Sequence, residues 1–159
     1  MKRWGCICLF VILLSGCGAE ETLETVSDEW IIPVMAQPRE IAVRLPENTV
    51  LPVMEQEGRR LYMAQDYEII LETMASGDLN ATIQALSGYD KDRLTVLETR
   101  QADADRYEFV WTTAGEQGDR LGRAVILDDG DYHYCMSVLR DAGESLVVWQ
   151  DVFQSFSLV

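Results

Sequence analysis

The chain has 159 residues, of which 27 are acidic and 13 basic, so its formal net charge is −14. A surface of this charge repels nucleic acid and anionic lipid headgroups, which argues against both as partners. The length is sufficient for one domain with a buried core and too short for two.

The N-terminus is typical of a bacterial lipoprotein leader. Lys2 and Arg3 form a positive region, and residues 5–14 form an apolar stretch of about ten residues, which is too short to span a bilayer. The stretch ends in a lipobox formed by Leu14, Ser15, Gly16 and Cys17. We therefore predict a signal peptide over residues 1–16 and a diacylglycerol anchor on Cys17. The alternatives are an ordinary signal peptide with an incidental cysteine, or a cytosolic protein with an apolar start.

Lipidation at Cys17 would hold the mature chain at the cell membrane, facing the extracytoplasmic side. Residues 17–28 comprise the lipidated cysteine and an acidic tether, and residues 29–159 form a single domain. Cys6 and Cys8 leave with the leader, so Cys135 is the one free cysteine of the mature sequence. An intrachain disulfide is therefore excluded, and a packed core has to stabilise the domain.

The first half of the domain is expected to form strands and one helix. Alternating polar and apolar residues predict strands over residues 39–45, 60–64 and 67–73. The period then changes to that of a helix, which we predict between an N-cap at Asp78 and a C-cap at Gly88. Its apolar stripe consists of Leu79, Ile83 and Leu86.

The second half is expected to form an antiparallel meander, because only short polar turns separate its strands. These strands are predicted over residues 94–100, 107–113, 121–127 and 132–139. A closing helix follows, because large apolar residues recur at helical spacing. They are Leu146, Trp149, Val152, Phe153 and Phe156.

The best-defined turn lies at residues 128–131, where an Asp-Gly pair is typical of a two-residue hairpin loop. The register expected from that loop pairs Leu127 with Tyr132, Val125 with Tyr134 and Arg123 with Met136. The opposite face then carries mostly small residues, and we expect the closing helix to pack on it. These residues are Gly122, Ala124, Ile126, His133, Cys135 and Ser137.

Three stretches resemble a known family: residues 76–79, residues 126–135 and residues 153–156. They are similar to the PsbP-like group, and their local sequences also resemble those of uncharacterised lipoproteins of Gram-positive gut bacteria. The resemblance implies an α+β domain, an antiparallel sheet with a C-terminal meander flanked by helices in an α/β/α sandwich. Members of that fold do unrelated jobs, so the resemblance carries over no catalytic residue and no cofactor.

His133 and Cys135 are the weak candidates for a functional face, because they are the one His/Cys pair of the mature chain. A metal site needs at least three ligands, and side chains two apart on a strand lie roughly 7 Å from each other, too far for a Cys–His nucleophile. We therefore favour a structural role for both residues, with no metal and no cofactor. The acidic turn is likewise expected to be a turn and not a calcium loop.

Aromatic residues on the meander could line a ligand groove, although alternating aromatics on a half-buried strand more often belong to the core. They are Tyr107, Trp111, Tyr132 and Tyr134. The sequence thus favours a monomeric, non-catalytic binding domain or an envelope-associated accessory domain, with an envelope protein or a small ligand as its partner. The alternative is an enzyme that uses the His133/Cys135 face.

Overall fold

The structure is a computed structural model that describes residues 36–159 apart from 50, 65, 116–117 and 142–145. Contacts group Met35–Val159 into one unit. The leader, the lipobox, Cys17, the tether and the predicted domain boundaries lie outside the described residues. So does the side chain of Leu146, which was expected on the stripe of the closing helix.

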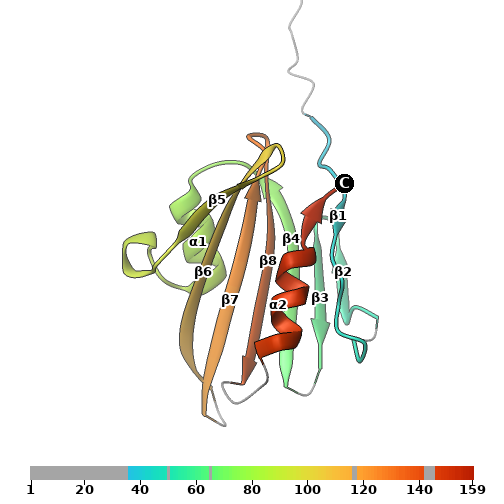
Figure 1. Cartoon of the computed structure of the whole chain (residues 1–159), viewed down its shortest axis with the longest axis vertical. Coiled ribbons are helices and arrows are strands. Elements are labelled where there is room, and N and C mark those ends of the chain that lie inside the picture. Colours follow the sequence, from blue (N-terminus) through green and yellow to red (C-terminus); the bar gives the residue numbers. More distant parts are fainter. Residues whose placement is uncertain (1–35, 50, 65, 116–117, 142–145) are drawn as a thin grey trace, which may run out of the picture. The chain divides into compact units, whose positions relative to one another are not determined.

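A seven-stranded sheet, antiparallel at every pairing, forms the centre of the domain (Figure 1). The strand order is β2-β3-β4-β8-β7-β6-β5. The strands are β2 (Met54–Gln56), β3 (Arg59–Met63), β4 (Tyr67–Ala75), β5 (Leu97–Gln101), β6 (Ala104–Gly115), β7 (Gly118–Asp128) and β8 (Tyr132–Asp141). The predicted meander is therefore confirmed as β5 to β8, and the short turns explain it because they can join only antiparallel neighbours.

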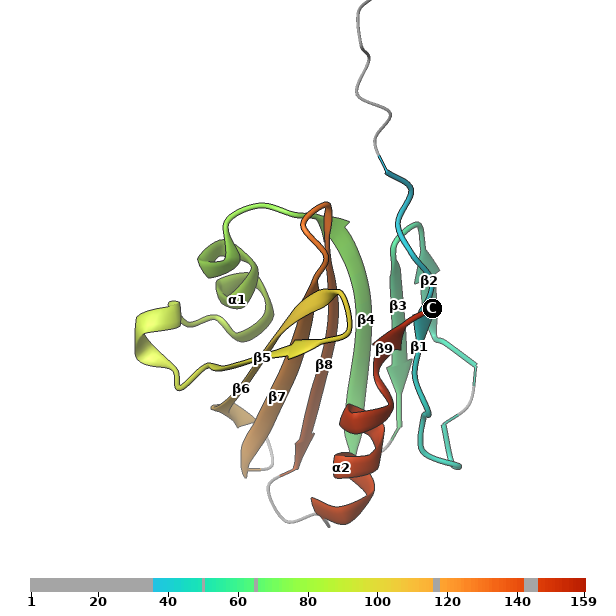
Figure 2. The same ribbon diagram turned by 45° about the horizontal axis from the view of Figure 1, so that its top comes forward.

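The two helices pack against opposite faces of this sheet (Figure 2). The helix α1 (Leu79–Ser87) begins at Asp78, whose side chain accepts the N–H of Asn80 at 3.0 Å, and ends at Gly88 with a left-handed backbone at φ 79°. Both predicted caps are thus confirmed. The helix α2 (Leu146–Ser155) lies on the other face. We call the two sides of the sheet the α1 face and the α2 face.

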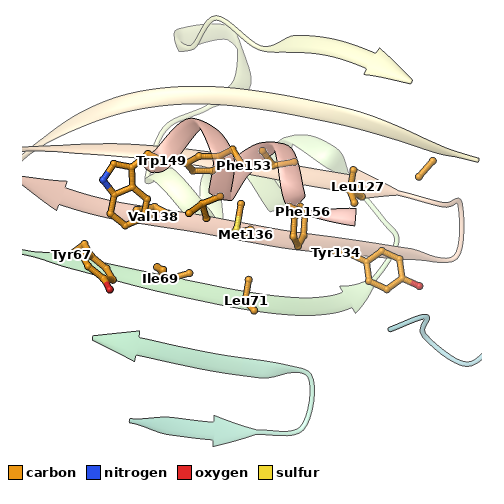
Figure 3. Packing of buried hydrophobic residues seen from close by; sticks show 13 residues of the cluster. Tyr67, Ile69, Leu71, Leu127, Tyr134, Met136, Val138, Trp149, Phe153 and Phe156 are labelled. Atoms are coloured by element: carbon orange, nitrogen blue, oxygen red, sulfur yellow. The ribbon is translucent and has the colours of Figure 1, made fainter. Parts of the chain in front are cut away.

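The described residues of the apolar stripe of the closing helix are buried, as predicted, and form part of the core of the α2 face. Trp149, Val152, Phe153 and Phe156 are all buried, and Figure 3 shows Trp149 and Phe153 directed from α2 onto the sheet. Aromatic and aliphatic side chains from three strands receive them. They are Tyr67, Ile69, Leu71, Val125, Leu127, Tyr134, Met136 and Val138. Burying each of the larger side chains contributes about 1.5–3 kcal/mol, so α2 is a major part of the stability of the domain.

The predicted fold class is wrong. The described part of the chain is β-rich, and its two α-helices of nine and ten residues do not form layers that flank the sheet in an α/β/α sandwich. A helix of that length extends about 14–15 Å, whereas seven strands span roughly 29 Å across the sheet. Each helix therefore covers a few strands, and within the described residues much of each sheet face has no helix over it.

The closing helix covers the other face from the one expected. We expected it on the small residues of β7 and β8, but those residues face α1, whose Ile83 packs with Ala124 and Cys135. The physical reason is Trp111 of β6. Its indole occupies the space above Gly122, so the small residues make room for an aromatic side chain and α1 instead of α2.

The predicted register of the β7–β8 hairpin is also wrong, because each β7 residue pairs with a residue two positions further along β8 than predicted. Leu127 pairs with Tyr134 and Val125 with Met136, because the two-residue loop is Gly130 and Asp131. Gly130 has φ 95° at the first loop position, as a type II′ turn requires. Since side chains alternate with a period of two, this difference of two residues leaves the assignment of side chains to the two faces unaffected.

The N-terminal strands differ most from the prediction. β1 (Ile41–Ala42) pairs with β9 (Ser157–Leu158) over two residues only, although the alternation predicts a strand over 39–45. β2 has no strong strand pattern and is held as the outer half of a hairpin with β3.

Neither helix among the described residues has the length and hydropathy of a membrane span.

Candidate functional site

His133 is completely buried and satisfied by polar neighbours on the α1 face. Its Nδ1 lies 2.9 Å from Thr82 Oγ1 on α1, and its Nε2 lies 3.3 Å from both Ser76 Oγ and Asp128 Oδ2. These contacts join the helix to the β7–β8 turn. Since the imidazole has no exposed surface, it serves to fasten α1 and is not presented to a ligand.

Cys135 lies on the same face and is also completely buried. Burial raises the pKa of the Cys135 thiol, and the nearby carboxylate of Glu72 raises it further. A nucleophilic cysteine needs the opposite, an accessible thiol with a depressed pKa. No cluster of three or more His, Cys, Asp or Glu side chains that could hold a metal occurs within the described residues.

The acidic turn uses its carboxylates to bind its own backbone. Asp128 Oδ1 accepts the N–H of Gly130 at 2.9 Å, and Asp129 Oδ1 accepts those of Asp131 at 3.1 Å and Tyr132 at 2.8 Å. Burial raises the pKa of Asp129, but the Tyr132 N–H and the Tyr134 hydroxyl outweigh burial and hold that pKa below its ordinary value. Turn formation thus accounts for these carboxylates.

The four aromatic candidates do not form one groove, because they lie on different faces. Tyr107 and Trp111 belong to the cluster on the α1 face. Tyr132 and Tyr134 pack in the core of the α2 face, with ring centroids 6.1 Å apart. They are core residues of two separate clusters.

An open groove of about 960 Å³ lies instead on the α2 face, beside α2 and over β6 and β7. Five charged side chains line it, and four of them are arginines: Arg93, Arg106, Glu108, Arg123 and Arg140. The larger apolar residues of its lining on this face are Leu97, Val110, Leu121, Val138, Trp149 and Phe153, whereas Leu94 and Phe109, which also line it, pack with the cluster on the α1 face. The groove therefore combines a cationic lining with apolar surface, in a chain whose net charge is −14.

Glu108 organises the inner end of the groove by bridging two arginines. Its Oε1 accepts Arg106 Nε at 2.7 Å and its Oε2 accepts Arg123 Nη2 at 2.8 Å. Burial raises the pKa of Glu108, but the hydrogen bonds from Arg123 and Arg106 outweigh burial and hold that pKa below its ordinary value. Glu108 is therefore ionised at neutral pH and balances one of the two positive charges.

Arg106 also fastens the end of α2 to the sheet. Its Nη2 donates to the carbonyl of Phe153 at 2.9 Å and its Nη1 to that of Phe156 at 3.3 Å. Phe153 is in the last turn of the helix, where carbonyls lack a partner within the helix. The guanidinium of Arg123 stacks 4.2 Å from the centre of the Phe153 ring. Both arginines thus set the position of α2, and with it the wall of the groove.

The outer part of the groove is more accessible. Leu97 is 59% exposed and Val110 is 49% exposed, although most large apolar side chains of the sheet are buried. Arg93 is exposed at the end of the short 3-10 turn η1 (Lys91–Arg93), and the Arg123 side chain keeps 35% of its surface accessible. These two arginines are the positive groups that a ligand in the groove can reach.

A smaller and more polar hollow of about 490 Å³ lies between β1 and the β2–β3 hairpin. Its lining carries both signs of charge, and Arg60 and Glu55 already pair across it at 3.0 Å. It has no excess of either charge sign comparable to that of the groove.

Sequence reasoning missed the groove, although one signal for it was present. The expected hairpin places Arg123 on the same face as the apolar residues Val125 and Leu127, and a charged residue on a core face is unusual. That anomaly marks where the apolar core gives way to the groove. The sequence could not predict the contribution of Arg93 in this way, because its position depends on the path of the chain between η1 and β5.

No family model and no curated protein matches this chain. A crystal structure from Bacteroides thetaiotaomicron VPI-5482 is similar to it, with a TM-score of 0.53 and 12% sequence identity. The match covers 75% of this chain and 45% of that one, so this chain spans less than half the length of the solved protein. At this identity the likeness concerns the fold alone.

Proposed function

We propose that this chain is a lipid-anchored, extracytoplasmic binding domain whose groove beside α2 receives an anionic ligand with an apolar part. The N-terminal sequence supports the anchor, because a leader with a positive region and an apolar stretch of the right length ends in the lipobox at residues 14–17. The groove supports the binding role. We propose further that the domain acts without catalysis.

The observation that carries the proposal is the excess of arginine in the groove. The described lining holds four arginines and one glutamate, whereas the chain as a whole has about twice as many acidic as basic residues. Arginine forks match carboxylate, sulfate and phosphate groups in geometry as well as in charge. A ligand with one such group and an apolar portion would engage Arg93 or Arg123 and cover Leu97 and Val110.

Because salt screens the negative charge of the rest of the surface, contacts inside the groove decide which ligand binds. A ligand approaching from a distance meets the net field of an acidic protein, which is screened beyond about 8 Å at physiological ionic strength. Inside the groove the four arginines outnumber the one glutamate of the described lining. We therefore expect modest association rates and a preference that is decided by direct contacts.

The chemistry of the His133/Cys135 face supports a non-catalytic role. Its imidazole and thiol are both without exposed surface, and its hydroxyl partners hold the imidazole in place. A reacting substrate would have to displace α1 to reach either group. The groove itself offers guanidinium groups, which bind anions and stay protonated near neutral pH, so they do not act as general bases.

Binding of two probes of opposite charge tests the proposal. The full chain, held in lipid nanodiscs, is titrated calorimetrically with 4-phenylbutanoate and with 4-phenylbutylamine, and empty nanodiscs provide the blank. We expect the anion to bind and the cation not to bind. The double variant Arg93→Gln/Arg123→Gln should weaken the anion by about tenfold or more, because two charge-assisted contacts are lost.

The matched control is Arg59→Gln/Arg60→Gln, which removes the same charge from exposed positions on β3. It should leave the affinity within about twofold, as expected for a screened, distant change. Equal binding of the anion and the cation, or an equal loss in both double variants, would refute the groove as the binding site.

A further inference from the structure

The outer edge of β6 beside the groove has no neighbouring strand over half its length. β5 pairs with β6 only between Ala104 and Glu108, but β6 continues to Gly115. On its other side β7 pairs with β6 along this whole stretch, from Phe109 opposite Ala124 to Gly115 opposite Gly118. Among the described residues, 109–115 therefore form a strand with one side that no other strand pairs with.

The backbone groups on that side belong to alternate residues. The carbonyl of Thr112 accepts the Tyr89 hydroxyl at 3.1 Å from outside the β6–β7 ladder, so Thr112 directs its backbone outward. Val110 and Ala114, two residues away on either side, do the same. Within the described part of the chain, no other hydrogen bond reaches the outward backbone groups of these three residues.

Tyr89 covers this edge at one point, where its hydroxyl donates to the Thr112 carbonyl and would have to be displaced by a pairing strand, but the edge lacks the other usual protection against pairing with another chain. Edge strands are commonly blocked by lysine, proline, a bulge or an inward charge. Here the outward positions are valine, threonine and alanine, and all three are exposed. The groove adjoins the edge, because Phe109 and Val110 line it together with Arg93.

We propose that the open edge of β6 binds an extended, acidic polypeptide segment of a partner protein, which adds a strand beside residues 110–114 and places carboxylates against Arg93 and Arg123. The inference rests on the proposed function and narrows its ligand to a peptide. Main-chain hydrogen bonds supply the affinity in this kind of recognition, and alternate side chains supply the specificity. The charge of the groove selects an acidic segment.

A second copy of this chain is the wrong occupant on charge grounds. Pairing two β6 edges about a two-fold axis would bring the same arginines of both copies together. It would also bring together two chains that each carry a net charge of −14. Like charges across an interface cost free energy and slow association, so the edge remains available to another protein.

The binding test uses the full chain in nanodiscs and three synthetic ten-residue peptides. The first alternates glutamate and valine, the second replaces every glutamate with lysine, and the third is the first with alternate backbone amides N-methylated. We expect the glutamate peptide to bind and the lysine peptide not to bind. N-methylation should weaken binding about tenfold or more, because it removes hydrogen bonds from the added strand.

Variants at Thr112 test the position of the added strand. Thr112→Pro removes the outward N–H and is compatible with an edge strand, whereas Thr112→Val keeps that N–H. We expect the first to weaken the glutamate peptide about tenfold and the second to leave it unchanged. Ala114→Pro serves as a second variant, and protection of the Thr112 amide from hydrogen exchange on peptide binding is measured in the unmodified chain.

The outcomes separate this inference from the proposed function. If 4-phenylbutanoate binds but the N-methylated peptide or a folded Thr112→Pro variant binds as tightly as its control, the edge inference is wrong and the groove remains a binding site. If neither phenylbutanoate nor the glutamate peptide binds, both proposals are wrong. A dimer without peptide, or a Thr112 amide already protected without peptide, would show that this chain itself occupies the edge and would overturn the inference.

Discussion

The indole of Trp111 lies directly above Gly122 on the neighbouring strand. A Cβ added at Gly122 would come within 2.1 Å of the Trp111 ring. The two residues are cross-strand partners in the β6–β7 ladder. This contact explains why the small residues of β7 and β8 face α1 and why the larger helix α2 packs on the other side.

The first prediction concerns this contact. Gly122→Ala should destabilise the domain by about 1–3 kcal/mol, since the indole has to move within a packed core. Chemical denaturation measures the change. The control is Gly77→Ala, where an added Cβ meets nothing within 4 Å and the backbone needs no glycine. Equal effects of the two substitutions would contradict the packing described for Trp111.

A second prediction concerns Glu108, which bridges Arg106 and Arg123. Glu108→Gln should cost about 1–3 kcal/mol at pH 7, because hydrogen bonds between charged groups are weakened in a largely buried place. Exposed Glu98→Gln on β5 is the control and should change the stability by less than about 0.5 kcal/mol. Comparable costs at the two positions would argue against the bridge.

The Glu108 bridge also has a predictable pH dependence. The pKa of Glu108 lies below its ordinary value in the folded chain, so the folded state binds its proton less readily than the unfolded state does. The stabilisation is therefore fully present above the ordinary value and is lost as pH falls through the folded pKa. The difference between Glu108 and Glu108→Gln, followed by denaturation from pH 7 down to acid, should shrink. A difference that grows on acidification would contradict the sign.

A third prediction concerns α2. Trp149 is 5% exposed and packs edge-on against Tyr67 with ring centroids 4.9 Å apart. Trp149→Ala should cost roughly 3–5 kcal/mol, while exposed Gln150→Ala on the same helix should cost little. A chain ending at Arg140 should unfold or aggregate. If that shortened chain keeps a cooperative melt like that of the full chain, α2 is not part of the core.

A fourth prediction concerns Cys135. Because burial and the raised pKa both suppress its reactivity, a bulky thiol reagent should label it slowly in the folded chain and rapidly in denaturant. Peptide mapping by mass spectrometry distinguishes it from the leader cysteines. Cys135→Ala should cost on the order of 1 kcal/mol and leave binding of 4-phenylbutanoate unchanged. Fast labelling of the folded chain would revive the enzyme alternative.

A fifth prediction concerns the anchor. Intact-mass measurement of the protein from its native membrane should find an acylated N-terminus at Cys17. Cys17→Ala should remove the lipid and release the protein, or leave the leader uncut. A mature N-terminus at any other residue would contradict lipidation.

Much of the local structure followed from the sequence because short-range chemistry determines it. The caps at Asp78 and Gly88, the stripe from Trp149 to Phe156 and the strands of the meander each depend on residues within a few positions of one another. The assignment of side chains to the two faces of the β7–β8 hairpin was likewise correct despite the wrong register, since a register difference of two residues preserves the alternation.

The tertiary structure alone decided how these elements combine. Which face α2 covers depends on Trp111 filling the space above Gly122, and these residues lie on different strands. The groove depends on the pairing of β5 with β6 being limited to residues 104–108 of β6. It also brings together Arg93 and Arg123, which are distant in the sequence. Local sequence patterns reflect the conformational preference of each residue, but they do not determine which side chain from a distant part of the sequence fills a given space in the core. The cationic groove and the open edge of β6 are consequences of that packing.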